Sequence, residues 1–208
     1  MDIKKITNNI ICVSFNNQFE LCDHFLRFQE HYESPKFRNQ VFTIGQFRDW
    51  YARQYGAFTY HEDWNGMNIP SYVFDAFKSG LFDPLTEKES KLLNLFKDRT
   101  DTYYVLGINS TDEEQALDHE ICHGLFYTNQ DYKEEVLEAL KPYDLANLKD
   151  WLIEIGYCEE VLDDECHAYI SADYDWLVEE KKASNLDLLK DLHDKLIDIK
   201  GKYFKEKK

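Results

Sequence analysis

Two histidines and a glutamate lie close together in residues 118–124, where the sequence contains the pattern His-Glu-x-x-His. His119 and His123 are four residues apart, so on a helix their side chains project from one face about one turn apart. In that arrangement two imidazole nitrogens can bind the same metal ion, and Glu120 lies beside them to accept or donate a proton. The pattern therefore predicts a metal-binding helix.

The pattern is short, so its neighbourhood has to support this interpretation. With 7 His and 19 Glu among 208 residues, random placement produces it with a probability of roughly 0.02. Residues 103–108, which are apolar and aromatic, predict a strand ahead of the motif. Thr111 and Glu114 form a capping-box pattern that would start the motif helix. A strand, a short loop and the metal-binding helix are thus expected in this order.

A catalytic zinc centre usually has three protein ligands and keeps its fourth position for water, so a third ligand is expected. The acidic residues 159–165 contain the candidates. Glu165 shares its face of a helix with four residues that can all point to a core: Val161, Leu162, Ala168 and Tyr169. An unpaired carboxylate would be costly there, and a metal ion would compensate for its burial. We expect Glu165 to complete the ligand set, with Asp164 and His167 as the alternatives.

The remainder of the chain predicts helices around a small sheet. An apolar, β-branched run predicts a second strand at residues 10–15. Apolar spacing, capping residues, Pro and Gly predict helices over residues 19–31, 43–54, 70–80, 86–96, 131–140, 145–155, 160–177 and 186–203. Residues 58–68 lack a period and are expected to form a loop or an irregular hairpin, and the Lys-rich end from residue 200 a solvated tail. The predicted fold class is α+β, mostly α.

We expect a single domain over residues 1–208, because a chain of this length fits one domain with a substantial elaboration. Residues 101–208 would form the metal-binding core, with the small sheet beside the metal-binding helix. Residues 1–100 would form a helical, aromatic elaboration. The sequence has no internal repeat, low-complexity tract or Gly/Ser-rich linker that would separate the two parts.

Composition limits the classes of partner. Hydrophobic residues make up 43% of the chain and aromatic residues 15%, enough for a well-packed core. The net charge of −16 argues against binding to nucleic acids or to an anionic membrane surface, because both need clustered Lys and Arg. A neutral or basic peptide would be tolerated, and a cationic partner would be steered towards the protein.

Cysteine usage and the N-terminus indicate a cytoplasmic protein. The 5 cysteines are an odd number at irregular spacing, with no Cys-x-x-Cys pair, so neither a zinc ribbon nor a disulfide framework is predicted. Reduced thiols are the expected state. The N-terminal residues contain neither a signal-peptide core nor a membrane span.

The pattern His119-Glu120-x-x-His123, followed about forty residues later by Glu165-x-x-Ala168, resembles the gluzincin branch of zinc metallopeptidases. The resemblance implies that His119, His123 and Glu165 bind Zn²⁺ and that Glu120 is the general base that polarises the zinc-bound water. It implies peptide hydrolysis as the reaction. No His-x-x-Gly-x-x-His extension follows His123, so the metzincin pattern is not matched.

The resemblance covers roughly residues 103–175 and implies a compact zincin-like fold. In zincins an edge strand lies alongside the metal-binding helix and can hold an extended peptide, and the order of strand 103–108 and the motif helix is similar to that arrangement. Residues 25–35 also resemble a stretch in bacterial proteins of uncharacterised function that carry the same His-Glu-x-x-His pattern.

A hydrogen-bond donor for the transition state is expected opposite the zinc, and the candidates are Tyr127, Tyr169 and His167. The substrate would be a peptide or protein that is basic or neutral. Two other interpretations stay open. One is a catalytically silent protein of this fold with a binding or regulatory role, which a fourth protein ligand such as His167 would favour. The other is a helical protein in which the motif arose by chance.

Overall fold

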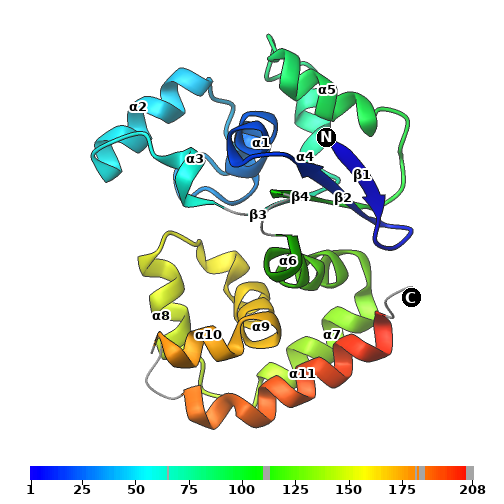
Figure 1. Ribbon diagram of the computed structural model, residues 1–208, viewed down its shortest axis with the longest axis vertical. Coiled ribbons are helices and arrows are strands. Elements are labelled where there is room, and N and C mark those ends of the chain that lie inside the picture. Colours follow the sequence, from blue (N-terminus) through cyan, green and yellow to red (C-terminus); the bar gives the residue numbers. More distant parts are fainter. Residues whose placement is uncertain (65, 110–112, 181, 183–185, 205–208) are drawn as a thin grey trace. The chain divides into compact units, whose positions relative to one another are not determined.

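The computed structural model describes residues 1–208 except 65, 110–112, 181, 183–185 and 205–208. The chain forms two compact units, Met1–Leu117 and Asp118–Lys208, and the boundary falls within helix α6 (Glu113–Thr128). The described residues are mostly helical with one small mixed sheet, which confirms the predicted α+β fold class (Figure 1). The helix cap expected at Thr111 lies outside the described residues.

Among the described residues of the first unit, four strands form one sheet in the order β1-β2-β4-β3. The strands are β1 (Asp2–Lys5), β2 (Ile10–Phe15), β3 (Gly66–Pro70) and β4 (Tyr104–Asn109). β2 and β4 are parallel to one another, and both are buried along almost their whole length, as a central strand requires. These two strands confirm the predictions. The other two were not predicted, because β1 is polar and exposed and β3 contains Gly and Pro.

The strand that precedes the motif helix is not an edge strand, contrary to the expectation. β4 pairs with β2 on one side and with β3 on the other, so its backbone hydrogen-bonding groups are used in both directions. An added peptide strand needs an edge with unpaired N–H and C=O groups. The edges of this sheet are β1 and β3.

Two of the helices described in the first unit, α2 (Ile44–Tyr55) and α5 (Glu87–Leu95), begin at the capping residues that the sequence predicts. The others are α1 (Gln18–Glu33), α3 (Tyr60–Asp63) and α4 (Val73–Lys78). Thr43 and Thr86 each form a capping box, at the starts of α2 and α5. Pro70 does not start a helix as predicted, because it pairs with Tyr104 as the last residue of β3 and the helix begins at Val73.

Helix α1 packs directly on the sheet at Gly107 of β4. A Cβ atom at this position would lie 2.7 Å from both Leu21 Cδ1 and Phe25 Cζ, closer than any real Cβ contact. A glycine is therefore required for α1 to approach the strand this closely. Aromatic rings make up much of the core around α1, with Phe77 stacked on both Phe28 and Phe82 at centroid distances of 3.9 and 4.0 Å.

A buried ion pair joins α1 to α5. Arg27 and Glu89 are 5% and 2% exposed, and two guanidinium nitrogens donate to the two carboxylate oxygens at 2.5 Å. Arg27 also donates to the backbone oxygens of Phe82 and Pro84. Burial of two opposite charges is tolerated only when the hydrogen bonds of both are satisfied, so each partner depends on the other.

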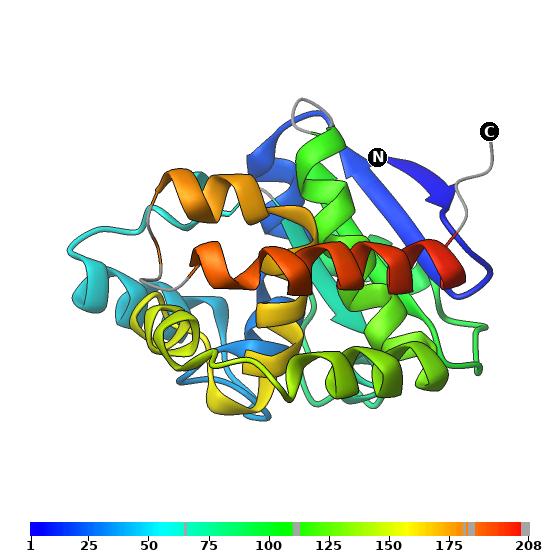
Figure 2. The same ribbon diagram turned by 90° about the horizontal axis from the view of Figure 1, so that it is seen from below.

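The second unit is helical. Besides α6 it contains α7 (Gln130–Leu140), α8 (Ala146–Glu154), α9 (Leu162–Ala172), α10 (Tyr174–Glu179) and α11 (Lys190–Tyr203), with 3-10 turns η1 (Glu159–Val161) and η2 (Leu186–Leu189). α9 contacts α7, α8, α10 and α11, and α11 runs beside α7 (Figure 2). The helix predicted over residues 160–177 is interrupted at Asp173, whose backbone angles leave the helical region, so α9 and α10 are separate.

The C-terminal helix contacts the first residue of the motif region. Lys200 is 7% exposed, and its ammonium group donates to the carboxylate and, at 3.3 Å, to the backbone oxygen of Asp118. The expectation of a solvated tail from residue 200 is therefore wrong for Lys200, because this ion pair and the helix, which ends at Tyr203, hold it in the unit. Residues 205–208 lie outside the described residues.

Candidate metal centre

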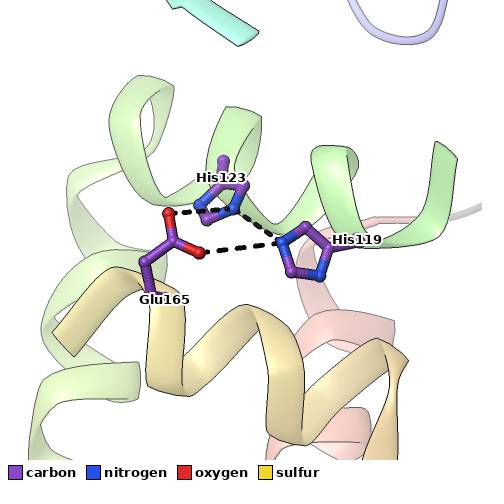
Figure 3. Close-up of side chains that lie close together, drawn as sticks. All are labelled: His119, His123 and Glu165. Carbon is purple, nitrogen blue, oxygen red and sulfur yellow. Dashed lines mark hydrogen bonds and ion pairs between the residues drawn. The ribbon is translucent and has the colours of Figure 1, made fainter. Parts of the chain in front are cut away.

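Helix α6 presents both motif histidines from one face, as their spacing predicts. Figure 3 shows the His119 and His123 rings projecting from α6 towards Glu165, which comes from α9. The Nε2 atoms of the two rings are 3.0 Å apart. His123 is 2% exposed at its side chain and His119 is 14% exposed, so the pair is largely shielded from water.

Glu165 completes a three-residue group. Its Oε1 lies 3.6 Å from His123 Nε2 and its Oε2 lies 3.9 Å from His119 Nε2, so each carboxylate oxygen faces one ring (Figure 3). The three candidate ligand atoms lie within 4.8 Å of one another, and the described residues contain this one such group. Ligands on a tetrahedral zinc ion, at bond lengths near ~2.1 Å, are about 3.4 Å apart. The observed separations bracket that value, so the group could hold a metal ion.

The carboxylate of Glu165 is buried as the sequence predicts. The side chain is 4% exposed, and Val161, Leu162 and Ala168 around it are buried as well. Its Oε2 has no hydrogen-bond partner among the described residues. Burial raises the pKa of Glu165 to about 7, against the lowering effect of the two histidines. A carboxylate in this position needs a cation to compensate for its lost hydration.

Two further carboxylates determine which ring nitrogen faces the group. Asp173 Oδ2 accepts a hydrogen bond from His119 Nδ1 at 2.6 Å, and Asp164 Oδ1 lies 3.0 Å from His123 Nδ1. A carboxylate accepts a proton from Nδ1, so a neutral ring keeps its lone pair on Nε2. Two lone pairs and the Glu165 carboxylate then converge on one point, which fits a metal ion in both charge and donor type.

The same carboxylates make this part of the unit favourable to positive charge. Burial disfavours the charged rings, yet the carboxylates raise the pKa of His119 and raise that of His123 well above its usual value. Burial likewise disfavours the charged form of Asp164, but His123 and His167 hold the pKa of this carboxyl well below its usual range. Asp164 Oδ1 contacts Nδ1 of His123, whereas Nε2 of this ring faces His119 and Glu165, and this geometry disfavours Asp164 as the third ligand.

Sequence reasoning missed Asp173. The residue lies just past the end of α9, where helix periodicity no longer fixes the direction of a side chain. The ligand spacing alone holds no signal for it. An acidic residue near the end of the helix that carries Glu165 was the one available hint.

Glu120 lies close to the ligand group. It is 7% exposed, and its Oε2 has no hydrogen-bond partner among the described residues. Its charge acts on His119, His123 and Glu165, raising the pKa of each. A buried carboxylate oxygen that has no partner among the described residues and belongs to a residue next to a candidate ligand is available to exchange a proton with a bound molecule.

The three candidate donors have different surroundings. His167 is fully buried, and its Nε2 and Nδ1 contact Tyr132 and Asp164 rather than the ligand group, which favours it neither as a donor nor as a fourth ligand. Tyr169 packs its ring against His119 at a centroid distance of 4.7 Å, and its hydroxyl interacts with Tyr157. Tyr127 follows His123 by one turn of α6 and is half-buried.

A comparison of the chain with protein-family models, curated proteins and solved structures finds no match. Among the described residues, the helices are too short or too polar to cross a membrane.

Proposed function

We propose that the protein is a zinc-dependent hydrolase of peptide amide bonds. The observation that carries the proposal is the convergence of His119 Nε2, His123 Nε2 and the Glu165 carboxylate beside Glu120, whose Oε2 has no hydrogen-bond partner among the described residues. Two imidazoles and one carboxylate are a donor set that zinc accepts in catalytic sites. The order of the four residues along the chain is that of the gluzincin pattern.

His119, His123 and Glu165 would hold the zinc ion, which would supply Lewis acidity, lowering the pKa of a bound water to about 7 and polarising a carbonyl group. Glu120 accepts a proton from the attacking water as the water oxygen forms a bond to the carbonyl carbon. It then gives the proton to the amine nitrogen as the carbon–nitrogen bond breaks, and so returns to its starting state. Asp173 and Asp164 keep His119 and His123 oriented throughout the cycle.

The charge of the second unit supports a neutral or basic peptide substrate. Residues 118–208 contain 23 Asp and Glu against 12 Lys and Arg, a net charge of −11. An acidic unit of this kind attracts cationic peptides and repels nucleic acids. The substrate class we propose is a peptide or protein segment without an excess of acidic residues.

The alternative function is a metal-binding or regulatory protein without activity. It would be favoured by a closed tetrahedral site with four protein ligands. The ligand group found among the described residues has three members, and His167 is turned to other partners. This arrangement supports the hydrolase over the silent metal protein.

The test of the proposed function is a Glu120→Gln variant assayed for zinc binding and for hydrolysis of a mixed library of fluorogenic peptides. Gln keeps the size of the side chain but cannot accept the water proton. Loss of a general base lowers the rate by about 10²- to 10⁴-fold. We expect zinc affinity to stay within a few-fold of wild type and hydrolysis to fall by this factor.

Glu154→Gln is the matched control, because Glu154 is an exposed glutamate of α8 in the same unit. This variant should hydrolyse the library at the wild-type rate. If Glu120→Gln hydrolyses peptides as fast as the control, Glu120 is not the base. If wild-type protein with zinc bound cleaves no peptide, the metal-binding alternative is correct.

A further inference from the structure

A chain of buried polar contacts extends from His123 away from the ligand group. Asp164 Oδ1 contacts His123 Nδ1 at 3.0 Å on one side and His167 Nδ1 at 3.3 Å on the other. The Tyr132 hydroxyl lies 2.7 Å from His167 Nε2. The four residues come from α6, α9 and α7, so the chain of contacts connects three helices of the second unit.

The inner members of this chain are fully removed from water. His167 and Tyr132 are both 0% exposed, and the His167 ring stacks on Phe126 at a centroid distance of 5.4 Å. A buried imidazole or hydroxyl is costly unless it is hydrogen-bonded, so these polar groups are poor choices for simple core packing. Their hydrogen bonds lead to Asp164 and through it to a candidate ligand.

The contacts restrict the orientation of His123. His167 Nδ1 lies near two oxygens of Asp164, the backbone oxygen at 3.1 Å and the carboxylate Oδ1 at 3.3 Å. Both oxygens accept hydrogen bonds, so Nδ1 of His167 is the donor. Because His167 fixes the Asp164 carboxylate, this carboxylate can accept the hydrogen bond from His123 Nδ1 in only one orientation of the His123 ring. If the carboxylate were free to rotate, the His123 ring could turn and direct a different atom at the ligand group.

We propose that His167 and Tyr132 are positioning residues for metal binding, which fix Asp164 so that His123 directs Nε2 at the metal. The proposal rests on the metal centre of the proposed function, and it does not depend on which reaction the centre performs. His167 thus contributes through Asp164 rather than as a ligand or as a donor to the substrate.

The experiment measures the dissociation constant of Zn²⁺ by competition with a chromophoric chelator. Tyr132→Phe removes one oxygen atom, and His167→Phe removes both nitrogens while it keeps a ring to stack on Phe126. Outer-shell partners of metal ligands are worth about 10- to 100-fold in metal affinity. His167 contacts the outer-shell residue Asp164, and Tyr132 contacts His167, so both lie further from the metal than such partners. We expect the dissociation constant to rise about tenfold for His167→Phe and about threefold for Tyr132→Phe.

Tyr174→Phe is the matched control. Tyr174 is a 6% exposed tyrosine of the same unit whose ring stacks on another histidine, His193, at a centroid distance of 4.7 Å. His193 is not one of the candidate ligands, so removal of the Tyr174 hydroxyl should leave zinc affinity unchanged even where it lowers thermal stability. A role of Tyr132 in packing alone predicts the same behaviour for both tyrosine variants.

Coupling distinguishes positioning from general destabilisation. In an Asp164→Asn background, the effects of Tyr132→Phe and His167→Phe on zinc affinity should largely disappear, because the residue through which they act is already altered. Undiminished effects in that background, or wild-type affinity in both single variants, would overturn the inference while the metal centre stands. A wild-type protein that binds no zinc would overturn the metal centre and this inference together.

Discussion

Asp173 offers the sharpest quantitative test of the site, because it contacts the candidate ligand His119 without belonging to the candidate ligand group itself. Its carboxylate accepts from Nδ1 at 2.6 Å, and the two side chains are 16% and 14% exposed. A hydrogen bond to an ionised, partly buried acceptor is about twice as strong as a neutral one. Asp173→Asn keeps the shape and an acceptor oxygen but removes the charge.

The expected loss of zinc affinity follows from the role of such partners. Removal of an outer carboxylate costs about 10- to 100-fold in metal affinity, or about 1.4 to 2.7 kcal/mol. We expect Asp173→Asn to lie near the lower limit, because an acceptor is retained, and Asp173→Ala near the upper one. The assay is chelator competition for Zn²⁺ at fixed pH and ionic strength.

Asp175→Asn is the control for charge. Asp175 is an exposed residue two positions further on, so its substitution changes the net charge equally without touching His119. It should leave the affinity for Zn²⁺ unchanged. Equal affinities for Asp173→Asn, Asp173→Ala and wild type would refute the assignment of Asp173 as the residue that orients His119.

Three further predictions concern stability, measured by urea or thermal denaturation. Burial raises the pKa of Glu165 from 4.5 to about 7, so ionisation of this group destabilises the metal-free fold as pH rises through this interval. Glu165→Gln should therefore stabilise metal-free protein at pH 8 but not at pH 4, and equal effects at both would contradict the reasoning. Arg27→Ala leaves the Glu89 carboxylate buried without its partner and should cost about 3 to 5 kcal/mol, whereas a loss below about 1 kcal/mol would contradict the mutual dependence of the two charges. Gly107→Ala should cost about 1 to 3 kcal/mol by forcing α1 away from β4. Gly45→Ala on α2 should not destabilise, because an added Cβ would lie 3.9 Å from Thr43 Oγ1, an ordinary van der Waals contact.

The parts of the fold that were predictable carry strong local signals. The apolar strands β2 and β4 and the capped helices α2 and α5 follow from short stretches of sequence. The positions of His119 and His123 on one helix face follow from their spacing. The apolar neighbours of Glu165 on its helix face predict that its side chain is buried, and in the structure this side chain lies close to His119 and His123.

The features that were missed depend on residues far apart in the sequence. The sequence of β3 has no strand periodicity, and the segment is a strand because its backbone pairs with β4. The same pairing makes β4 an interior strand. The contacts of Asp173 with His119 and of Lys200 with Asp118 join positions 54 and 82 residues apart. No periodicity within one helix can indicate such pairs, because they arise when helices pack.

Anomalous diffraction at the zinc absorption edge, from crystals of protein loaded with Zn²⁺, would show whether His119, His123 and Glu165 bind the metal. We expect one strong peak within about 2.0 to 2.2 Å of His119 Nε2, His123 Nε2 and a Glu165 oxygen, with Asp164 and Asp173 on the outer nitrogens. The absence of a peak at this position, or zinc bound by other side chains, would contradict this expectation.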